Sequence, residues 1–149
     1  MKIEKFVPIS QSHPVQIVKN KAGAIREVRL YLEDEEFTVH NDFIQKMTRL
    51  PSLEKLIIVQ SKIDNDGLRS IRKMSSLKML AIQNSPITDR GLRHLVGLAN
   101  LEQVGFYQTG VTYEYVRKFH EQIPHIEFLD CWCCGCMSFD PITRQSARD

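Results

Sequence analysis

The residues with the most obvious chemistry lie near the end of the chain. Four cysteines fall within a window of six residues, shortly after two histidines: Cys131, Cys133, Cys134 and Cys136, with His120 and His125. Thiolate and imidazole groups are ligands that zinc prefers. Zinc-binding chains usually supply their ligands in pairs from separate turns, whereas adjacent Cys133 and Cys134 would both have to bend back toward one ion. The spacing argues against a metal, and we expect no metal and no cofactor.

Three interpretations of the cysteines stay open: buried core residues, a zinc site, and redox or lipid-attachment chemistry. A disulfide framework would distribute the cysteines along the chain to close loops across the fold, whereas these four lie close together in the sequence. Free cysteine behaves as a small buried hydrophobe, and Cys131, Cys134 and Cys136 fall at inward positions of the repeat described below. We therefore favour core cysteines, with Cys133 as the most reactive of the four.

No other segment has the residue pattern of a catalytic site. The sequence contains no HExxH, no phosphate-binding glycine loop and no GxSxG, and we expect no enzyme. The 20 basic and 18 acidic residues are spread evenly, so a nucleic-acid partner is not predicted. Arg69, Arg72 and Lys73 are interpreted as the solvated face of a helix. No apolar run approaches the roughly 18 residues of a membrane span, and no signal peptide is apparent, so we expect a cytoplasmic protein.

The elements that must position any site repeat at a fixed interval. Residues 53–58, 77–82 and 101–106 fit LxxLxL and begin 24 residues apart. The match continues downstream as IDNDGLRSI and ITDRGLRHL. A fourth segment, 126–131, is aligned with a 25-residue interval, and a fifth, 25–30, lies 28 residues before Leu53. A period of this length indicates stacked structural units.

These units resemble the leucine-rich repeat family, in particular the bacterial-type and F-box-associated variety that reads roughly LxxLxLxxTxITDxGLxxLxxLxx. The resemblance is strongest over residues 53–100, extends to about 136 and fades before Ile25. It departs at Tyr115, where the neighbouring units have glycine, so we expect that helix to sit differently. The family implies an α/β fold, a short solenoid arc with a parallel inner sheet and outer helices, used for protein recognition or scaffolding.

The residues themselves predict the same elements. Alternation through Leu56 and Ile58 is typical of a half-buried strand, and apolar residues at three-residue spacing after it indicate a helix. Asp64, Thr88 and Thr112 precede these stripes and can cap the helices. We expect an N-terminal cap over 1–24 that includes a possible hairpin around the turn at 20–23, about four or five repeats over 25–137, and a flexible tail over 138–149.

Side chains alternate between the two faces of a strand, so the residues beside the core positions should face the concave side of the sheet. The predicted partner-binding residues are Tyr31, Lys55, Ile57, Val59, Met79, Ala81, Gln83, Tyr107, Phe128 and Trp132. Isolated apolar residues on a surface need no explanation, but a contiguous patch with aromatic residues is typical of an interface.

The sequence thus predicts a protein–protein interaction module with an adaptor or recognition role, whose partner is a protein. Two alternatives stay open: a structural scaffold subunit of a larger assembly, and a small zinc-binding or redox protein that uses the cysteines. Five strands span about 19 Å and offer about 400 Å², half of one side of a standard interface. Binding through this face alone should therefore be weak.

Overall fold

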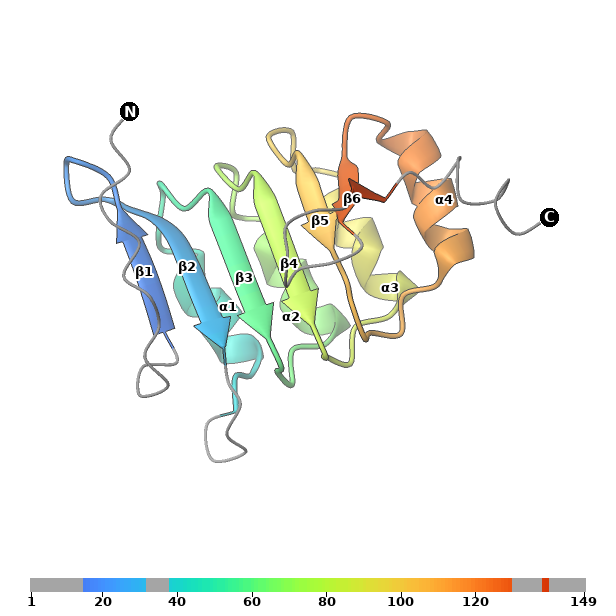
Figure 1. The fold of residues 1–149 in the computed structure, drawn as a ribbon, viewed down its shortest axis with the longest axis horizontal. Coiled ribbons are helices and arrows are strands. Elements are labelled where there is room, and N and C mark those ends of the chain that lie inside the picture. The colour runs from blue at the N-terminus through green and yellow to red at the C-terminus, as the bar shows by residue number, and fades with distance from the viewer. Residues whose placement is uncertain (1–14, 32–37, 130–137, 140–149) are drawn as a thin grey trace.

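The computed structural model describes residues 15–31, 38–129 and 138–139. Within these ranges, seven strands form one sheet in sequence order: β1 (Val15–Lys19), β2 (Ile25–Tyr31), β3 (Lys55–Val59), β4 (Met79–Gln83), β5 (Gln103–Gly105), β6 (Glu127–Leu129) and β7 (Ser138–Phe139). The helices are α1 (Asn41–Met47), α2 (Asn65–Ile71), α3 (Asp89–Leu92), the 3-10 helix η1 (Arg93–Leu95) and α4 (Tyr113–Gln122). Figure 1 shows the helices gathered on one face of the sheet.

The strands that begin the predicted repeats lie side by side and run parallel, from β2 to β6. The 24-residue period reappears as sheet register, because Lys55, Met79, Gln103 and Glu127 are direct neighbours on successive strands. The expected α/β architecture of parallel strands backed by helices is confirmed.

The predicted register of β6 is wrong by one residue. A 25-residue interval would put Phe128 beside Gln103, but Phe128 pairs with Val104. Its side chain is only 4% exposed and packs edge-to-face on Phe119, with ring centroids 5.8 Å apart. Phe128 is therefore a core residue and not a partner-binding one. The apolar match at Ile126 caused the error, because Ile126 is buried just before the strand begins.

Antiparallel strands flank the parallel ones at both ends of the sheet. β1 and β2 form the hairpin expected from the turn residues. In that turn the Asn20 side chain accepts hydrogen bonds from the backbone N–H groups of Ala22 and Ala24, and Gly23 takes a φ of 83°. At the other end, β7 pairs with β6. Of the tail expected over 138–149, the structure describes only residues 138–139, and the expected flexibility stays a prediction.

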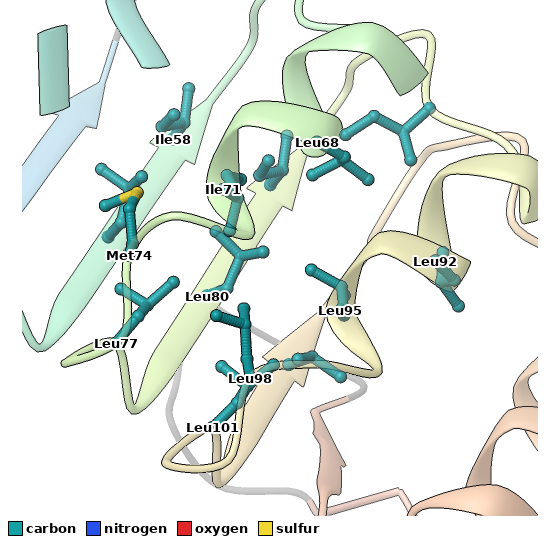
Figure 2. Packing of buried hydrophobic residues seen from close by; sticks show 14 of the residues in the cluster. Ile58, Leu68, Ile71, Met74, Leu77, Leu80, Leu92, Leu95, Leu98 and Leu101 are labelled. Atoms are coloured by element: carbon teal, nitrogen blue, oxygen red, sulfur yellow. The ribbon is translucent and has the colours of Figure 1, made fainter. Parts of the chain in front are cut away.

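The core lies between the sheet and the helices. Leu80 of β4 meets Leu68 and Ile71 of α2 there, and Leu92 and Leu95 of the next unit continue the same layer (Figure 2). All five are fully buried. Burial of a leucine or isoleucine side chain contributes about 1.5–3 kcal/mol, so this continuous layer is what holds the short helices on the sheet.

Successive helices are joined by side-chain hydrogen bonds that we call interhelix clamps. The four helices begin at positions 41, 65, 89 and 113, again 24 residues apart. In each clamp, the first residue of one helix bonds to the N-cap residue of the next: Asn41 with Asp64, Asn65 with Thr88, and Asp89 with Thr112. The Asn65 amide oxygen accepts from the Thr88 N–H at 2.9 Å, while its amide nitrogen donates to the Thr88 Oγ1 at 2.8 Å. The clamps fix the spacing of the units on the helical side.

The clamps also account for glycine in the repeat. A Cβ atom at Gly67 would lie 2.4 Å from Asn41 Oδ1, and one at Gly91 would lie 2.6 Å from Asn65 Oδ1. The next position in this series is Tyr115, which is half-buried against the core. α4 makes less extensive contact with α3 than α3 and η1 make with α2. The departure at Tyr115 therefore coincides with looser packing between the last two helices.

The chain leaves each inner strand through the same backbone conformation. Gln60, Asn84 and Gln108 have φ values of 63°, 50° and 52°. The left-handed region is unfavourable for residues with a Cβ. It turns the chain inward here, and two residues that follow, Ser61 and Ser85, are buried with their hydroxyl oxygens 2.7 Å apart.

Candidate protein-binding face

The face of the sheet opposite the helices is the one that sequence alternation predicts to be concave. We call it the open face. Its side chains alternate with the core positions of each strand: Glu27 and Arg29 on β2, Lys55, Ile57 and Val59 on β3, Met79, Ala81 and Gln83 on β4, Gln103 and Gly105 on β5, and Glu127 and Leu129 on β6. Tyr31 ends β2 beside Val59, but its side chain lies outside the description.

The middle row of the open face offers almost no surface. Ile57 and Ala81 are neighbours in this row, and they are 5% and 1% exposed. Residues of adjacent strands lie only about 4.8 Å apart. Ile57 therefore has Arg29 and Ala81 beside it on the neighbouring strands. Along its own strand, the next side chains on the same face are Lys55 and Val59. Ile57 and Ala81, two of the predicted partner-binding residues, therefore expose almost no surface in this structure.

The row near the strand ends is more accessible. Val59 and Gln83 are half-buried register partners. The Gln60 N–H donates to the Gln83 carbonyl at 2.8 Å, and the Asn84 N–H donates to the Tyr107 carbonyl at 2.9 Å. Tyr107 therefore continues the row of Val59 and Gln83, and its side chain is 47% exposed. An aromatic side chain thus ends a row of apolar and amide groups.

The row at the strand starts is polar. Glu27 is buried and forms an ion pair with Arg29. Met79 is half-buried and Lys55 is exposed. At the far end, the Gln103 amide nitrogen donates to Glu127 Oε2 at 2.8 Å. Sequence alignment missed Glu127 on this face, although the unbroken 24-residue period would have placed it beside Gln103.

Of the chemistry-bearing residues near the C-terminus, the structure describes only His120 and His125. Trp132 and the four cysteines lie outside the described residues. His120 is in α4, with its ring 6.3 Å from that of Phe128, and His125 is exposed before β6. Across residues 15–31, 38–129 and 138–139, His, Cys, Asp and Glu side chains form no group that could hold a metal ion.

Comparisons with known proteins support the fold and leave the partner open. No family model and no curated protein sequence matches the chain. One similar solved structure is "Leiomodin-1 Actin-Binding Site 2 (ABS2)", with 14% identity and a TM-score of 0.53 over 67% of this chain and 64% of that one. This chain thus spans less than two thirds of that neighbour. The likeness supports a leucine-rich-repeat-like fold and shows nothing further at this identity.

The helices of this fold are short. In the part of the chain that the structure describes, none is long and apolar enough to cross a membrane.

Proposed function

We propose that this chain is a protein-binding module that recognises one partner through the open face. The observation that carries the proposal is Tyr107, a 47% exposed tyrosine that continues the row of Val59 and Gln83 on the face that the helices leave uncovered. Tyrosine is enriched among the residues that dominate interface energies. Half-buried side chains lie beside it and would help to exclude water from the interface, which is where such a residue contributes most to the binding energy.

The proposed role is recognition, as an adaptor in the cytoplasm and without enzymatic activity. The neighbouring structure is an actin-binding site of leiomodin-1, so a similar fold carries a site for a protein in at least that case. This supports the class of function for our chain. The partner itself is a separate question, because two proteins whose sequences are 14% identical need not share a ligand.

The revised binding residues are Lys55, Val59, Met79, Gln83, Gln103, Tyr107 and Glu127. Tyr31 and Trp132, whose side chains lie outside the description, stay predicted binding residues. The revised set excludes Phe128, which is in the core, and the buried middle row. This leaves less apolar surface than sequence alone predicts. The polar side chains at the strand starts would orient a partner more than they would add buried area. We therefore propose weak binding, with an interface smaller than the standard of about 800 Å² per partner.

The chain offers a matched pair for testing this proposal. Tyr107 and Tyr113 are both exposed tyrosines, at 47% and 41%, but Tyr113 begins α4 on the helical side. A photo-crosslinking amino acid at position 107 should capture a protein in cells of the native source, and the same group at position 113 should not. The captured protein is then purified, and its affinity is measured for Tyr107→Ala and Tyr113→Ala.

Loss of a dominant interface side chain costs about 2 kcal/mol, roughly thirtyfold in affinity. We expect that loss for Tyr107→Ala, an unchanged melting temperature, and a change within about twofold for Tyr113→Ala. Equal crosslinking at both positions, or equal affinity of both variants, would show that the open face is not the binding face.

A further inference from the structure

The helical side of the molecule carries two rows of charged side chains with different patterns. Both rows follow the 24-residue period. In the first helical turn the signs alternate: Asp66, Arg90 and Glu114. One turn later every member is an arginine: Arg69, Arg93 and Arg117. The uniform row needs an explanation, because neighbouring like charges repel one another.

Packing of α2 against α3 and η1 brings two members of this row, Arg69 and Arg93, onto neighbouring helices. α2 contacts both α3 and η1, and Arg69 and Arg93 are exposed on α2 and η1. The pKa of His94, next to Arg93, is lowered first by burial and then by the positive charges of Arg93, Arg69 and Arg72, with Asp66 opposing them. Three guanidinium groups therefore act on a single imidazole, and the local field is positive.

Several cations of the described residues have acidic partners, and the three arginines beside His94 are not among them. Arg26 bonds to Glu54 at 2.7 Å, and Lys118 bonds to Glu114 at 3.0 Å. Lys46 and Lys78 also have ion pairs, with Asp42 and Glu54. Among the residues that the structure describes, Arg69, Arg72 and Arg93 form no ion pair. Their positive charge is left for an external anion.

The helix dipole gives only part of an explanation. Cations are favoured in the last turn of a helix, and Arg69 and Arg93 occupy such turns. The equivalent position of α1, however, is Gln45. A unit of this repeat can therefore form without a cation at this position, and only the later units carry arginine there.

We propose that Arg69, Arg72 and Arg93 form an arginine surface that binds an acidic segment of a protein, rich in aspartate and glutamate. The planar guanidinium presents paired N–H groups that match a carboxylate. Nucleic acid would need a more extended basic surface, and the chain balances 20 basic with 18 acidic residues. This proposal concerns the helical side, and it stands whether or not the open face binds a partner.

The test uses the whole chain and a fluorescein-labelled peptide of alternating glutamate and serine, with binding followed by fluorescence anisotropy at low ionic strength. The first variant is Arg69→Gln with Arg93→Gln, because glutamine is the residue that α1 carries in this row. The control is Lys21→Gln with Lys62→Gln, which removes the same charge from two exposed positions elsewhere. Melting temperatures check that both proteins fold, and the single variant Arg72→Gln provides the same readout if the double one does not fold.

The peptide should bind the native chain, and the arginine variant should weaken binding by about fivefold or more, while the lysine control changes it by less than about twofold. Absence of binding, or an equal loss in both double variants, would overturn the proposal. An oligouridylate of matched charge is the second probe. Tighter binding of that RNA than of the peptide would overturn the assignment to an acidic protein.

Discussion

Asn41 and Asp64 hydrogen bond to each other in both directions. The Asn41 amide nitrogen donates to Asp64 Oδ1 at 2.8 Å, and the Asp64 N–H donates to Asn41 Oδ1 at 3.1 Å. The same Asp64 carboxylate caps α2 by accepting from the N–H groups of Asp66 and Gly67. One side chain therefore joins the start of its own helix to the start of the preceding one.

A double-mutant cycle on this pair should show that the two residues are coupled. Asp64→Ala removes both the cap and the clamp and should cost about 1–2 kcal/mol of the free energy of unfolding. Asn41→Ala should cost less, and its effect should shrink when Asp64 is already absent, with a coupling energy of at least about 0.5 kcal/mol. Denaturant unfolding measures all four proteins. Additive effects would mean that the clamp contributes nothing beyond its separate parts.

The same contact makes stability depend on acid. The hydrogen bond from Asn41 lowers the pKa of Asp64 below its ordinary value of 3.8, burial opposes this, and the backbone N–H groups of the cap lower the pKa further. A lowered folded-state pKa stabilises the protein above pH 3.8, and this contribution is lost as the pH falls through the folded-state value. We expect the melting temperature of the native chain to fall toward that of Asp64→Asn over this range. A difference between the two proteins that stays constant down to about pH 2 would contradict the assignment.

Position 91 should not tolerate the substitution Gly91→Ala, although alanine is the better helix former by about 1 kcal/mol. The new Cβ would lie 2.6 Å from Asn65 Oδ1 and 2.7 Å from Leu68 Cδ1. Asn65 cannot swing aside without breaking its clamp to Thr88. We expect Gly91→Ala to lower the free energy of unfolding by about 1–3 kcal/mol.

Gly97 provides the control for this substitution, because a Cβ there meets nothing within 4 Å. Gly97→Ala should be neutral or stabilising by up to about 1 kcal/mol. Thermal and denaturant unfolding of both variants test the prediction, and equal effects would show that the clamp does not demand glycine.

The corrected register of β6 predicts opposite results for two adjacent residues. Phe128→Ala removes a buried ring that packs on Phe119 and should cost about 3–5 kcal/mol of stability. Glu127→Ala removes an open-face group bonded to Gln103 and should cost about 1 kcal/mol. Denaturant unfolding distinguishes the two substitutions. A larger loss at Glu127 than at Phe128 would restore the register predicted from sequence.

The cysteine window makes a prediction that rests on its spacing alone. If Cys131, Cys133, Cys134 and Cys136 bind no metal, elemental analysis of the purified protein should find no stoichiometric zinc. A chelator should then leave the melting temperature unchanged. One zinc per chain, together with a lower melting temperature after chelation, would establish a metal site.

Much of the fold could be predicted from the sequence because the repeat reports directly on register. Leu56, Leu80 and Val104 share a column in the sequence and pair across β3, β4 and β5. The same reasoning failed at Phe128, where an apolar match was preferred to the fixed period. Side-chain alternation is strict in a strand, so a shift of one residue moved a core phenylalanine to the wrong face.

The candidate site was less predictable, because exposure depends on neighbours from several strands. Alternation places Ile57 and Tyr107 on the same face, but only the three-dimensional arrangement shows one buried and the other exposed. The clamps were also missed, although Asp64, Thr88 and Thr112 were predicted to be caps. A cap can be predicted from a single helix, whereas its partner on the preceding helix requires the stacking distance.

The interhelix clamps determine the order in which the molecule should come apart. Each clamp joins only adjacent units, so α2 and α3 are each held from both sides, through the pairs at Asn41, Asn65 and Asp89. α1 contributes to one clamp and α4 to one. In a protein built from nearest-neighbour contacts, local opening starts where fewest neighbours hold a unit. The outer units should therefore fray first and exchange their amide protons soonest, while the two middle units open only when the whole chain unfolds.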